Sequence, residues 1–574
     1  MWIYYINFQL LPQTFKGFTS CSLNVPFCWP HAQIIARMHT TRGRYQQFSG
    51  IFESTYRLLK TDPITKQNIF YATISGLLLT GSFPGIGISW LAWFALVPLL
   101  ISLNNLSPKE SFRLGVLAGL VHYLTLMYWI AYTLKTFGHL PLYLGIPILF
   151  LFCAYLTLYL GVFSWMMARF APKPVLSLFV IPVFWVSLEY IRSHLLSGFP
   201  WELIGYSQYK VLHLIQISDI LGVYGISFLV VFCNATILMA FLFIRKRKWQ
   251  GTKVNKHLAV GAVSVFGIVF AIVWFYGKWR INWIDQLALI SASSRISIVQ
   301  GNIDQKIKWD PRFQIATTDK YIGLSLKAKK ENPDLIVWPE TAAPFNFLND
   351  IALTKKVQKG IRETDTSFVF GSPSFKPGEN IVKYYNSAYL VDSDAKVLGR
   401  YDKAHLVPFG EYIPFKKWFP FLGKMVEQVG DFWPGKSGST LNWGEYRLGM
   451  LICYEIIFPN LAREMIKNKA LLLINITNDA WYGKTSAPHQ HFSMAVFRAV
   501  ENRRALVRSA NTGISGFIDP AGRIVSSTSL FKDAVMTRSM TLINTATIYT
   551  RIGDAFAWLC LAVTLLVTIL RSRR

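Results

Sequence analysis

The sequence predicts a bundle of about eight membrane-spanning helices joined to a polar α/β domain outside the cytoplasm. Three observations support this fold class. Of the 574 residues, 52% are hydrophobic and 15% are aromatic, which is too apolar for an ordinary soluble protein. Long apolar stretches flank one polar block at residues 278–551. Within this block, short β-branched segments alternate with charged helical ones, as is typical of α/β domains.

The charge distribution separates the same two parts. The chain has 59 basic and 31 acidic residues, a net charge of +28. Residues 295–538 hold 33 basic and 23 acidic residues, so +18 belongs to the rest of the chain. This excess lies at the ends of the apolar stretches, which is the positive-inside pattern. Because the basic residues form no single patch, we expect no nucleic-acid partner.

Seven apolar stretches precede the polar block and one follows it. Most approach or exceed the roughly 20 residues that cross a bilayer. The first two are short and share the turn Pro84-Gly85-Ile86-Gly87, so we expect a tight helical hairpin there. The stretches cover 68–86, 88–105, 112–135, 141–168, 174–192, 219–244, 257–277 and 552–570. We therefore expect a bundle over 65–278, an α/β domain over 290–545 and a final transmembrane helix over 552–570.

Loop charges predict the orientation. The loop 245–256 contains six basic residues and the chain ends with three more at 571–574, whereas the turn 83–88 has none. Placing the basic segments in the cytoplasm puts both termini inside and the polar block outside. The segment 192–218 then also lies outside and is amphipathic enough to lie on the membrane surface. It is either an interfacial connector or a loop that handles substrate.

Residues 1–60 form an N-terminal extension to which the sequence assigns no function. Its start has no basic segment, and its apolar run is too short for a secretory signal. Met38 is an alternative start.

Cys453 is the one cysteine of the polar block, and it ends the apolar run Arg447-Leu-Gly-Met-Leu-Ile-Cys453. A lone thiol cannot form an intradomain disulfide, and it lacks the paired spacing of a zinc site. It is therefore either a buried filler or a nucleophile. The pair His489 and His491 has no further ligand at metal-binding spacing, so we interpret it as a loop histidine pair. We expect no metal and no cofactor.

Two other strand ends carry charged residues that packing alone does not explain. Glu340 follows the apolar segment 335–339, and Lys403 and Glu411 lie eight residues apart in a loop-like stretch. A carboxylate can take the proton of a thiol, and an ammonium group can stabilise an oxyanion together with the backbone N–H after the cysteine. A thiol, a carboxylate and an ammonium group together form a complete set of side chains for acyl transfer. From spacing alone, each is equally an ordinary surface charge.

Glu340, Lys403 and Cys453, in this order and context, resemble the Glu-Lys-Cys triad of the carbon-nitrogen hydrolase (nitrilase) superfamily. Over roughly residues 65–570 the chain resembles the apolipoprotein N-acyltransferase family, which has several spans, an exported nitrilase-like domain and a final span. The supporting motifs are Val299–Asp310, Pro339-Glu340-Thr341, Val407–Pro414, Cys453-Tyr454-Glu455 and Asn475–Gly483.

The resemblance implies a nitrilase-like αββα sandwich and a ping-pong mechanism. Cys453 would take the sn-1 acyl chain of a phospholipid, typically phosphatidylethanolamine, as a thioester. The acceptor would be the α-amine of the S-diacylglyceryl cysteine at the N-terminus of an apolipoprotein. Glu340 is implied as general base and Lys403 as oxyanion stabiliser. Further residues implied in catalysis or in supporting the site are Trp309, Glu411, Tyr454 and Glu455. The implied location is the bacterial inner membrane, with the catalytic domain on the periplasmic side. The enzyme is expected to be a monomer.

Two other function classes fit parts of the sequence. A membrane-tethered amidase or nitrilase would use water as acceptor, but eight spans are costly for a soluble substrate. A transporter with a binding domain would be expected to show repeat symmetry and charged midplane residues, and neither is evident.

Charged residues outside the triad leave further alternatives. Glu189 and Arg192, near the end of the fifth apolar stretch, are either functional or snorkel to the interface. The run 498–504 is most simply a charged helix face, although Glu501 and Arg504 are alternatively braces of the α/β core.

Overall fold

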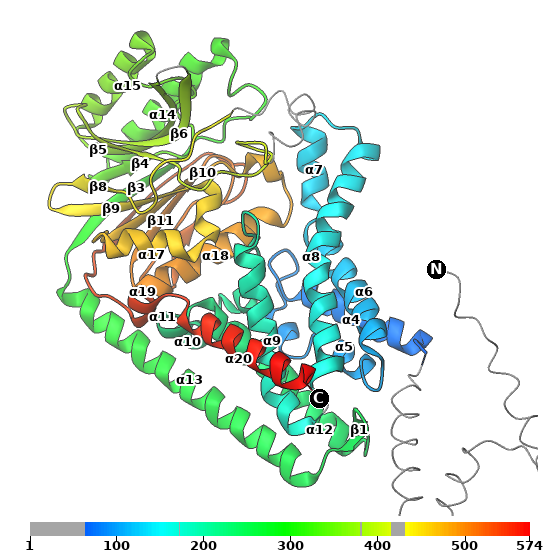
Figure 1. Ribbon diagram of the computed structural model, residues 1–574. Coiled ribbons are helices and arrows are strands. Elements are labelled where there is room, and N and C mark those ends of the chain that lie inside the picture. Colours follow the sequence, from blue (N-terminus) through cyan, green and yellow to red (C-terminus); the bar gives the residue numbers. More distant parts are fainter. Residues whose placement is uncertain (1–62, 172, 379–380, 415–430, 574) are drawn as a thin grey trace, which may run out of the picture. The chain divides into compact units, whose positions relative to one another are not determined.

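The structure, a computed structural model, describes residues 63–171, 173–378, 381–414 and 431–573 (Figure 1). The N-terminal extension predicted over residues 1–60 lies outside the described residues.

The first half of the described chain is helical, apart from one small β-hairpin. Its first helices are α4 (Lys66–Gly81), η2 (Ser89–Trp93), α5 (Val97–Ser102), α6 (Pro108–Leu126), α7 (Trp129–Thr136), α8 (Leu142–Phe170) and α9 (Pro174–His194). They are followed by η3 (Ile204–Gln208), α10 (Leu212–Ile215), α11 (Ser218–Leu221), α12 (Val223–Ile244), the hairpin β1 (Lys248–Trp249) and β2 (Thr252–Lys253), and α13 (Lys256–Ile290).

Five helices of the described ranges are long and apolar enough to cross a membrane, namely α8, α9, α12, α13 and α20 (Ala555–Ser572). A sixth span results if α6 and α7, which are bent by 50° at a short break, count as one. The first two predicted stretches are shorter than expected, because α4 has 16 residues and the second is divided into η2 and α5. Eight crossings and their orientation therefore stay a prediction.

The turn between the first two stretches has the geometry that its glycines predict. Gly85 and Gly87 both have positive φ, of 118° and 79°, which glycine adopts without the steric cost that other residues meet. The helix α4 contacts both η2 and α5, so the expected helical hairpin is present, with its second arm formed by η2 and α5.

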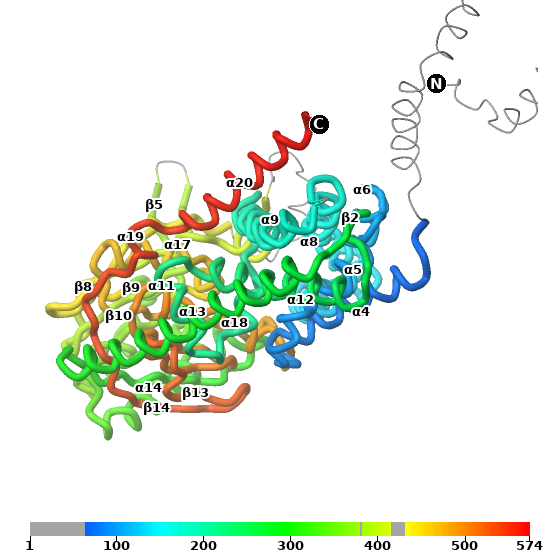
Figure 2. Tube along the Cα trace, turned by 90° about the horizontal axis from the view of Figure 1, so that it is seen from below, coloured from blue at the N-terminus to red at the C-terminus, as the bar shows by residue number. Residues whose placement is uncertain are grey.

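The helix α13 extends well beyond the predicted stretch 257–277. It has 35 residues and so a length of about 52 Å. No proline interrupts it, and a Cβ at Gly277 would collide with the carbonyl oxygen of His213. This close approach lets α13 pack against α10 and α12 on its way to the α/β domain (Figure 2).

Two six-stranded sheets form the centre of the α/β domain. Their strand orders are β14-β3-β4-β5-β6-β7 and β13-β12-β11-β10-β9-β8. The elements of the first half are β3 (Ser293–Gln300), α14 (Pro311–Lys329), β4 (Leu335–Val337), α15 (Ile351–Thr364), β5 (Ser367–Pro377), β6 (Val382–Val391) and β7 (Val397–Asp402). The elements of the second half are β8 (Thr440–Trp443), β9 (Tyr446–Ile452), η4 (Cys453–Ile457), α17 (Pro459–Lys467), β10 (Leu472–Thr477), η5 (Asp479–Tyr482), α18 (Ala487–Asn502), β11 (Ala505–Ala510), β12 (Gly516–Ile518), β13 (Ile524–Ser527), β14 (Ala534–Thr541) and α19 (Ile548–Ile552).

The two sheets are stacked between two helical layers. The helices α14 and α15 lie on the first sheet, and α17 and α18 lie on the second (Figure 1). The central strands β3-β4-β5 and β9-β10-β11 are parallel. Because both faces of a parallel sheet are covered, such strands are apolar along their length. Ser509 of β11 donates a hydrogen bond of 3.1 Å to the Val337 carbonyl oxygen of β4, which joins the two sheets. The result is the four-layer αββα arrangement that the sequence resemblance implied.

The α/β domain packs on the bundle through buried polar contacts. Arg503, at the end of α18, is fully buried and lies 2.8 Å from Asp219 of α11. Asp219 also accepts hydrogen bonds from Arg280 and Tyr276 of α13, at 2.6 and 2.7 Å. Most of the segment 192–218 is buried, although residues 194–196 and Lys210 are exposed, and its predicted place at the membrane surface stays a prediction.

The run 498–504 is also buried, so its interpretation as a charged helix face is wrong. Arg498 and Glu501 form an ion pair of 3.0 Å with both side chains inaccessible to solvent. Arg504 donates to the Ala470 and Thr545 carbonyl oxygens at 2.9 and 2.6 Å. Glu501 and Arg504 thus brace the core, as the alternative interpretation proposed.

Replacing Asp219 with asparagine is expected to destabilise the protein by about 3–5 kcal/mol, because it leaves the buried Arg503 without its counter-charge. Thermal unfolding of the purified protein in detergent measures the effect. The control is Lys320→Met, which removes the exposed pair between Lys320 and Asp533 and should leave the melting temperature unchanged. Equal melting temperatures for both variants would contradict a stabilising role of Asp219.

Candidate active site

Three strand ends bring the predicted catalytic residues together. Glu340 follows β4, Lys403 follows β7 directly, and Cys453 follows β9 directly. Their side chains are buried, with exposed fractions of 6%, 1% and 6%. Because β4 and β7 belong to one sheet and β9 to the other, the three residues meet where the two sheets face each other.

Lys403 lies among acceptor oxygens. Its Nζ is 2.9 and 3.0 Å from the two carboxylate oxygens of Glu411 and 3.9 Å from Oε1 of Glu340. Asn386 of β6 donates to Oε1 of both glutamates, at 2.7 and 2.9 Å. Burial opposes the charge on Lys403, but Glu411, Glu340 and Cys453 outweigh it and raise its pKa above the usual value. Lys403 is thus a permanent cation at neutral pH.

The Cys453 side chain is a thiol at neutral pH. Burial, and then the Glu340 carboxylate, raise its pKa to about 12, and Lys403 opposes the shift only in part. A nucleophilic thiolate therefore requires removal of the proton during the reaction. Glu340 can receive this proton, because its Oε2 is buried and accepts no hydrogen bond from the described residues.

The backbone turns sharply at Cys453. Its φ is 52°, a left-handed conformation that costs a residue other than glycine about 1–3 kcal/mol. The turn leads from β9 into η4, as in other strained turns that present a nucleophile at a strand end.

Glu455 holds this turn against the loop of Lys403. Its Oε2 accepts from the Ile452 backbone N–H at 2.7 Å. Its Oε1 accepts from the backbone N–H of Ala404 and His405 at 2.7 and 3.0 Å, and from the Tyr401 hydroxyl at 2.9 Å. Burial raises the pKa of Glu455 to about 7, and these donors oppose the shift. Glu455 is therefore placed to support the site and is not aimed at the thiol.

Replacing Glu455 with glutamine is expected to lower kcat about 100-fold, because its amide N–H₂ would face at least one of these four donors and displace the loop of Lys403. Activity and thermal stability of the purified variant measure the effect. The matched control is Tyr401→Phe, which removes one of the four donors and should cost far less. Wild-type kcat in the glutamine variant would show that this hydrogen-bonded connection is dispensable.

Tyr454 and Trp309 lie at the edges of the site. Tyr454 is buried, and its ring packs against Phe458 at 5.1 Å between centroids. Trp309 is 48% exposed and lines an open groove of about 740 Å³ together with Tyr384 and Phe432. The structure therefore brings Glu411 and Glu455 into contact with the triad or its loops, and places Trp309 outside it.

Two buried polar residues of the site, Lys308 and Asn386, were not singled out from the sequence, and a third, His491, was assigned no role there. Lys308 donates to the Glu340 carbonyl oxygen at 3.0 Å, and Asn386 bridges the two glutamates. His491 lies 3.2 Å from the Cys453 carbonyl oxygen and 3.0 Å from Asp479. It belongs to the helix α18, so the predicted loop histidine pair is wrong. The sequence signal for Lys308 was its place in the motif Val299–Asp310, and the signal for Asn386 was its polarity within the strand β6.

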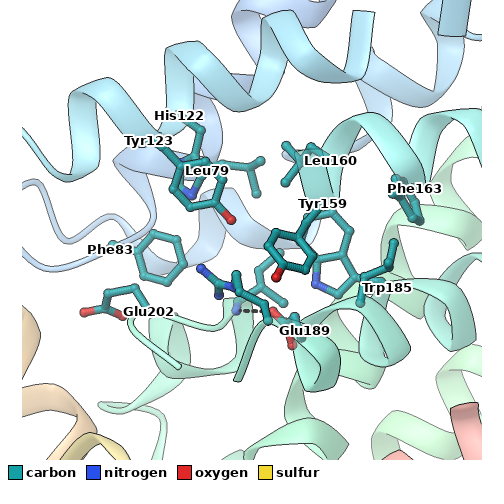
Figure 3. Close-up of a pocket in the computed structure, with 13 residues that line it drawn as sticks. Leu79, Phe83, His122, Tyr123, Tyr159, Leu160, Phe163, Trp185, Glu189 and Glu202 are labelled. Carbon is teal, nitrogen blue, oxygen red and sulfur yellow. Dashed lines mark hydrogen bonds between the residues drawn. The ribbon is translucent and has the colours of Figure 1, made fainter. Parts of the chain in front are cut away.

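A small cavity of about 30 Å³ lies within the bundle (Figure 3). Glu189 and Arg192 of α9 line it and are buried, which excludes the snorkelling that one interpretation proposed. Glu189 accepts from the Ile204 backbone N–H at 2.7 Å. Glu202 lines the same cavity and accepts from Ser493 of α18 at 3.2 Å. The cavity thus adjoins the helix that places His491 beside Cys453.

Comparison with known proteins agrees with both parts of the chain. Residues 75–236 match the family model for the apolipoprotein N-acyltransferase N-terminal domain, and residues 295–548 match that for carbon-nitrogen hydrolase. The apolipoprotein N-acyltransferase of Geobacter metallireducens is 42% identical over 90% of this chain and 98% of the relative. The chain belongs to the apolipoprotein N-acyltransferase family. That of Methylococcus capsulatus is 31% identical over 84% of this chain and 92% of the relative.

Membership of the apolipoprotein N-acyltransferase family makes the protein an acyltransferase with a nitrilase-like domain. Its apolar helices fit a membrane location. Among solved structures, an amidase from Nesterenkonia sp. is 21% identical with a TM-score of 0.34, over 46% of this chain and 94% of the amidase.

Proposed function

We propose that the enzyme transfers the sn-1 acyl chain of a phospholipid, typically phosphatidylethanolamine, to the N-terminal S-diacylglyceryl cysteine of apolipoproteins. The observation that supports this most is the buried group of a thiol, a carboxylate with one free oxygen and a lysine, in a domain packed directly on apolar helices. The names of the relatives agree with a lipoprotein as acceptor.

In the first half-reaction, Sγ of Cys453 attacks the ester carbonyl carbon while Glu340 takes the thiol proton. Lys403 and the backbone N–H after Cys453 stabilise the oxyanion that forms. The C–O bond then breaks, and Glu340 returns the proton to the departing alcohol of the lysophospholipid. The acyl chain remains as a thioester on Cys453.

In the second half-reaction, the neutral α-amine of the lipidated cysteine attacks the thioester. Glu340 accepts a proton from the attacking nitrogen, the C–S bond breaks, and the proton returns to the Cys453 sulfur. Conversion of a thioester to an amide is strongly downhill, so this step drives the overall transfer. A thioester beside lipid is also less exposed to water than one in open solvent.

We further propose that the catalytic domain faces the periplasm, with both ends of the bundle in the cytoplasm and eight crossings between them. The distribution of basic residues supports this orientation. Both the donor lipid and the lipidated acceptor are then available in the same leaflet.

Incubation of the purified enzyme with acyl-labelled phospholipid and a diacylglyceryl-cysteine peptide tests the proposed function. The enzyme is expected to become labelled first, through a thioester that hydroxylamine cleaves, with release of lysophospholipid. The final product is then a peptide that carries the label in an amide bond. Release of free fatty acid without acylated peptide would instead indicate a hydrolase, and release of ammonia from an amide would indicate an amidase.

A further inference from the structure

Lys308 is a buried cation that the catalytic cycle above does not use. Its side chain is 1% exposed, and Nζ has one hydrogen-bond partner among the described residues, the carbonyl oxygen of Glu340. An ammonium group has three N–H bonds, so two remain without an acceptor. Because a buried charge without its hydrogen bonds is costly, this arrangement indicates a group that binds there during the reaction.

Lys308 also lies within the electrostatic reach of the reacting groups. Burial lowers the pKa of Lys308 to about 8, and the Glu340 carboxylate, together with the Cys453 sulfur once it has lost its proton, opposes this shift. Lys308 is therefore mostly protonated at pH 7. Lys308 donates to the backbone carbonyl oxygen of Glu340, and the next residue, Thr341, has a φ of 50°. The position of the Lys308 Nζ is therefore coupled to the position of the catalytic carboxylate.

The two lysines of the site differ in the number of N–H bonds that have no acceptor among the described residues. Lys403 already contacts both oxygens of Glu411 at 2.9 and 3.0 Å, and Oε1 of Glu340 lies 3.9 Å away. Its positive charge is thus largely balanced by carboxylates. Lys308 contacts a neutral carbonyl oxygen and no carboxylate within 4 Å among the described residues, so it is the less compensated cation.

We propose that Lys308 is a further catalytic residue, which donates its free N–H bonds to the oxyanion formed when Cys453 attacks the acyl carbonyl. This inference rests on the thioester mechanism proposed above and extends it. Lys308 keeps its proton throughout, because it only donates hydrogen bonds, and proton transfer remains with Glu340. The role of Lys403 is then to balance Glu340 and Glu411 and to share the same oxyanion through its remaining N–H.

Single-turnover formation of the labelled acyl-enzyme tests this role. Lys308→Met removes the charge but keeps the length of the side chain, and it is expected to slow acylation about 100-fold with little change in KM for the donor. The matched control is Lys306→Met, which changes an exposed lysine two residues away and should leave the rate unchanged. Lys308→Arg retains the charge and should recover part of the rate.

Lys308 could bind either the oxyanion or the phosphate of the lipid, and a comparison of two acyl donors distinguishes these two anions. If Lys308 acts on the oxyanion, Lys308→Met is as slow with a phosphate-free p-nitrophenyl ester of the same fatty acid as with phospholipid. A defect seen with phospholipid only, or one confined to KM, would assign Lys308 to the phosphate and overturn the proposal.

The pH dependence of acylation gives a second readout, which compares the wild-type enzyme with the conservative variant Lys308→Arg. Lys308 must be protonated to act, so acylation is expected to decline as the pH rises through about 8. In Lys308→Arg the decline should disappear, because arginine stays charged over this range. An equal decline in both proteins would overturn the proposal. Absence of any acyl-enzyme in the wild type would instead refute the thioester mechanism itself.

Discussion

Cys453→Ala is expected to reduce acyl transfer about 10⁶-fold, to below detection, and to abolish the labelled acyl-enzyme. The remaining site residues cannot replace the sulfur, because Glu340 and Lys403 act on a nucleophile and do not supply one. The measurement is quantification of both the hydroxylamine-sensitive acyl-enzyme and the acylated peptide. Persistence of acylated peptide would show direct transfer between the two substrates and exclude a covalent intermediate on this residue.

Two properties of Cys453→Ala make the result easy to interpret. The change removes one sulfur atom from a buried position, so the fold and the melting temperature should be nearly preserved. Cys233→Ala is the matched control, since Cys233 is a free thiol of α12 in the helical bundle. It should retain full activity. Loss of activity in both variants would point to a general effect of removing thiols from this protein.

The sequence predicted the strands of the α/β fold well where they contain apolar runs, as in Leu335–Val337 and in the strand Tyr446–Ile452 that ends before Cys453. It did not predict β11, because Arg508 and Ser509 interrupt its apolar pattern. Arg508 is buried and paired with Asp479 at 2.8 Å, a compensation between distant segments that no local pattern contains. The small helices α10 and α11 were missed for the same reason, since α10 packs on α12 and α13, and α11 packs on α18 and α19 as well as α12.

The positions of the candidate catalytic residues followed from chemistry at strand ends, and the sequence resemblance assigned their roles. The neighbours that tune them were not predicted, because each acts through a contact that folding creates. Asn386 is a polar residue within a strand, and its function depends on two glutamates 46 and 25 positions away. Lys308 is one basic residue among 59, and only burial distinguishes it from the exposed Lys306.

Glu340→Gln is expected to slow both half-reactions by about 10²–10⁴-fold, which is the usual contribution of a general base. Glutamine has the same size and can still accept the hydrogen bond of 2.7 Å from Asn386 through its carbonyl oxygen. Its N–H₂ group would then occupy the position of Oε2, the oxygen that is free to accept the thiol proton. Since the pKa of Cys453 is raised to about 12, few molecules would hold a thiolate without this base.

Both half-reactions have to be measured separately for Glu340→Gln. Acylation is followed with labelled phospholipid alone, and transfer is followed by adding the acceptor peptide to whatever acyl-enzyme has accumulated. Glu363→Gln, at an exposed position of α15, is the control for the change of charge and should behave as the wild type. A defect in acylation alone would mean that the acceptor amine loses its proton to another group. A single carboxylate that serves both steps requires both rates to fall together, because the same free oxygen receives the proton in each.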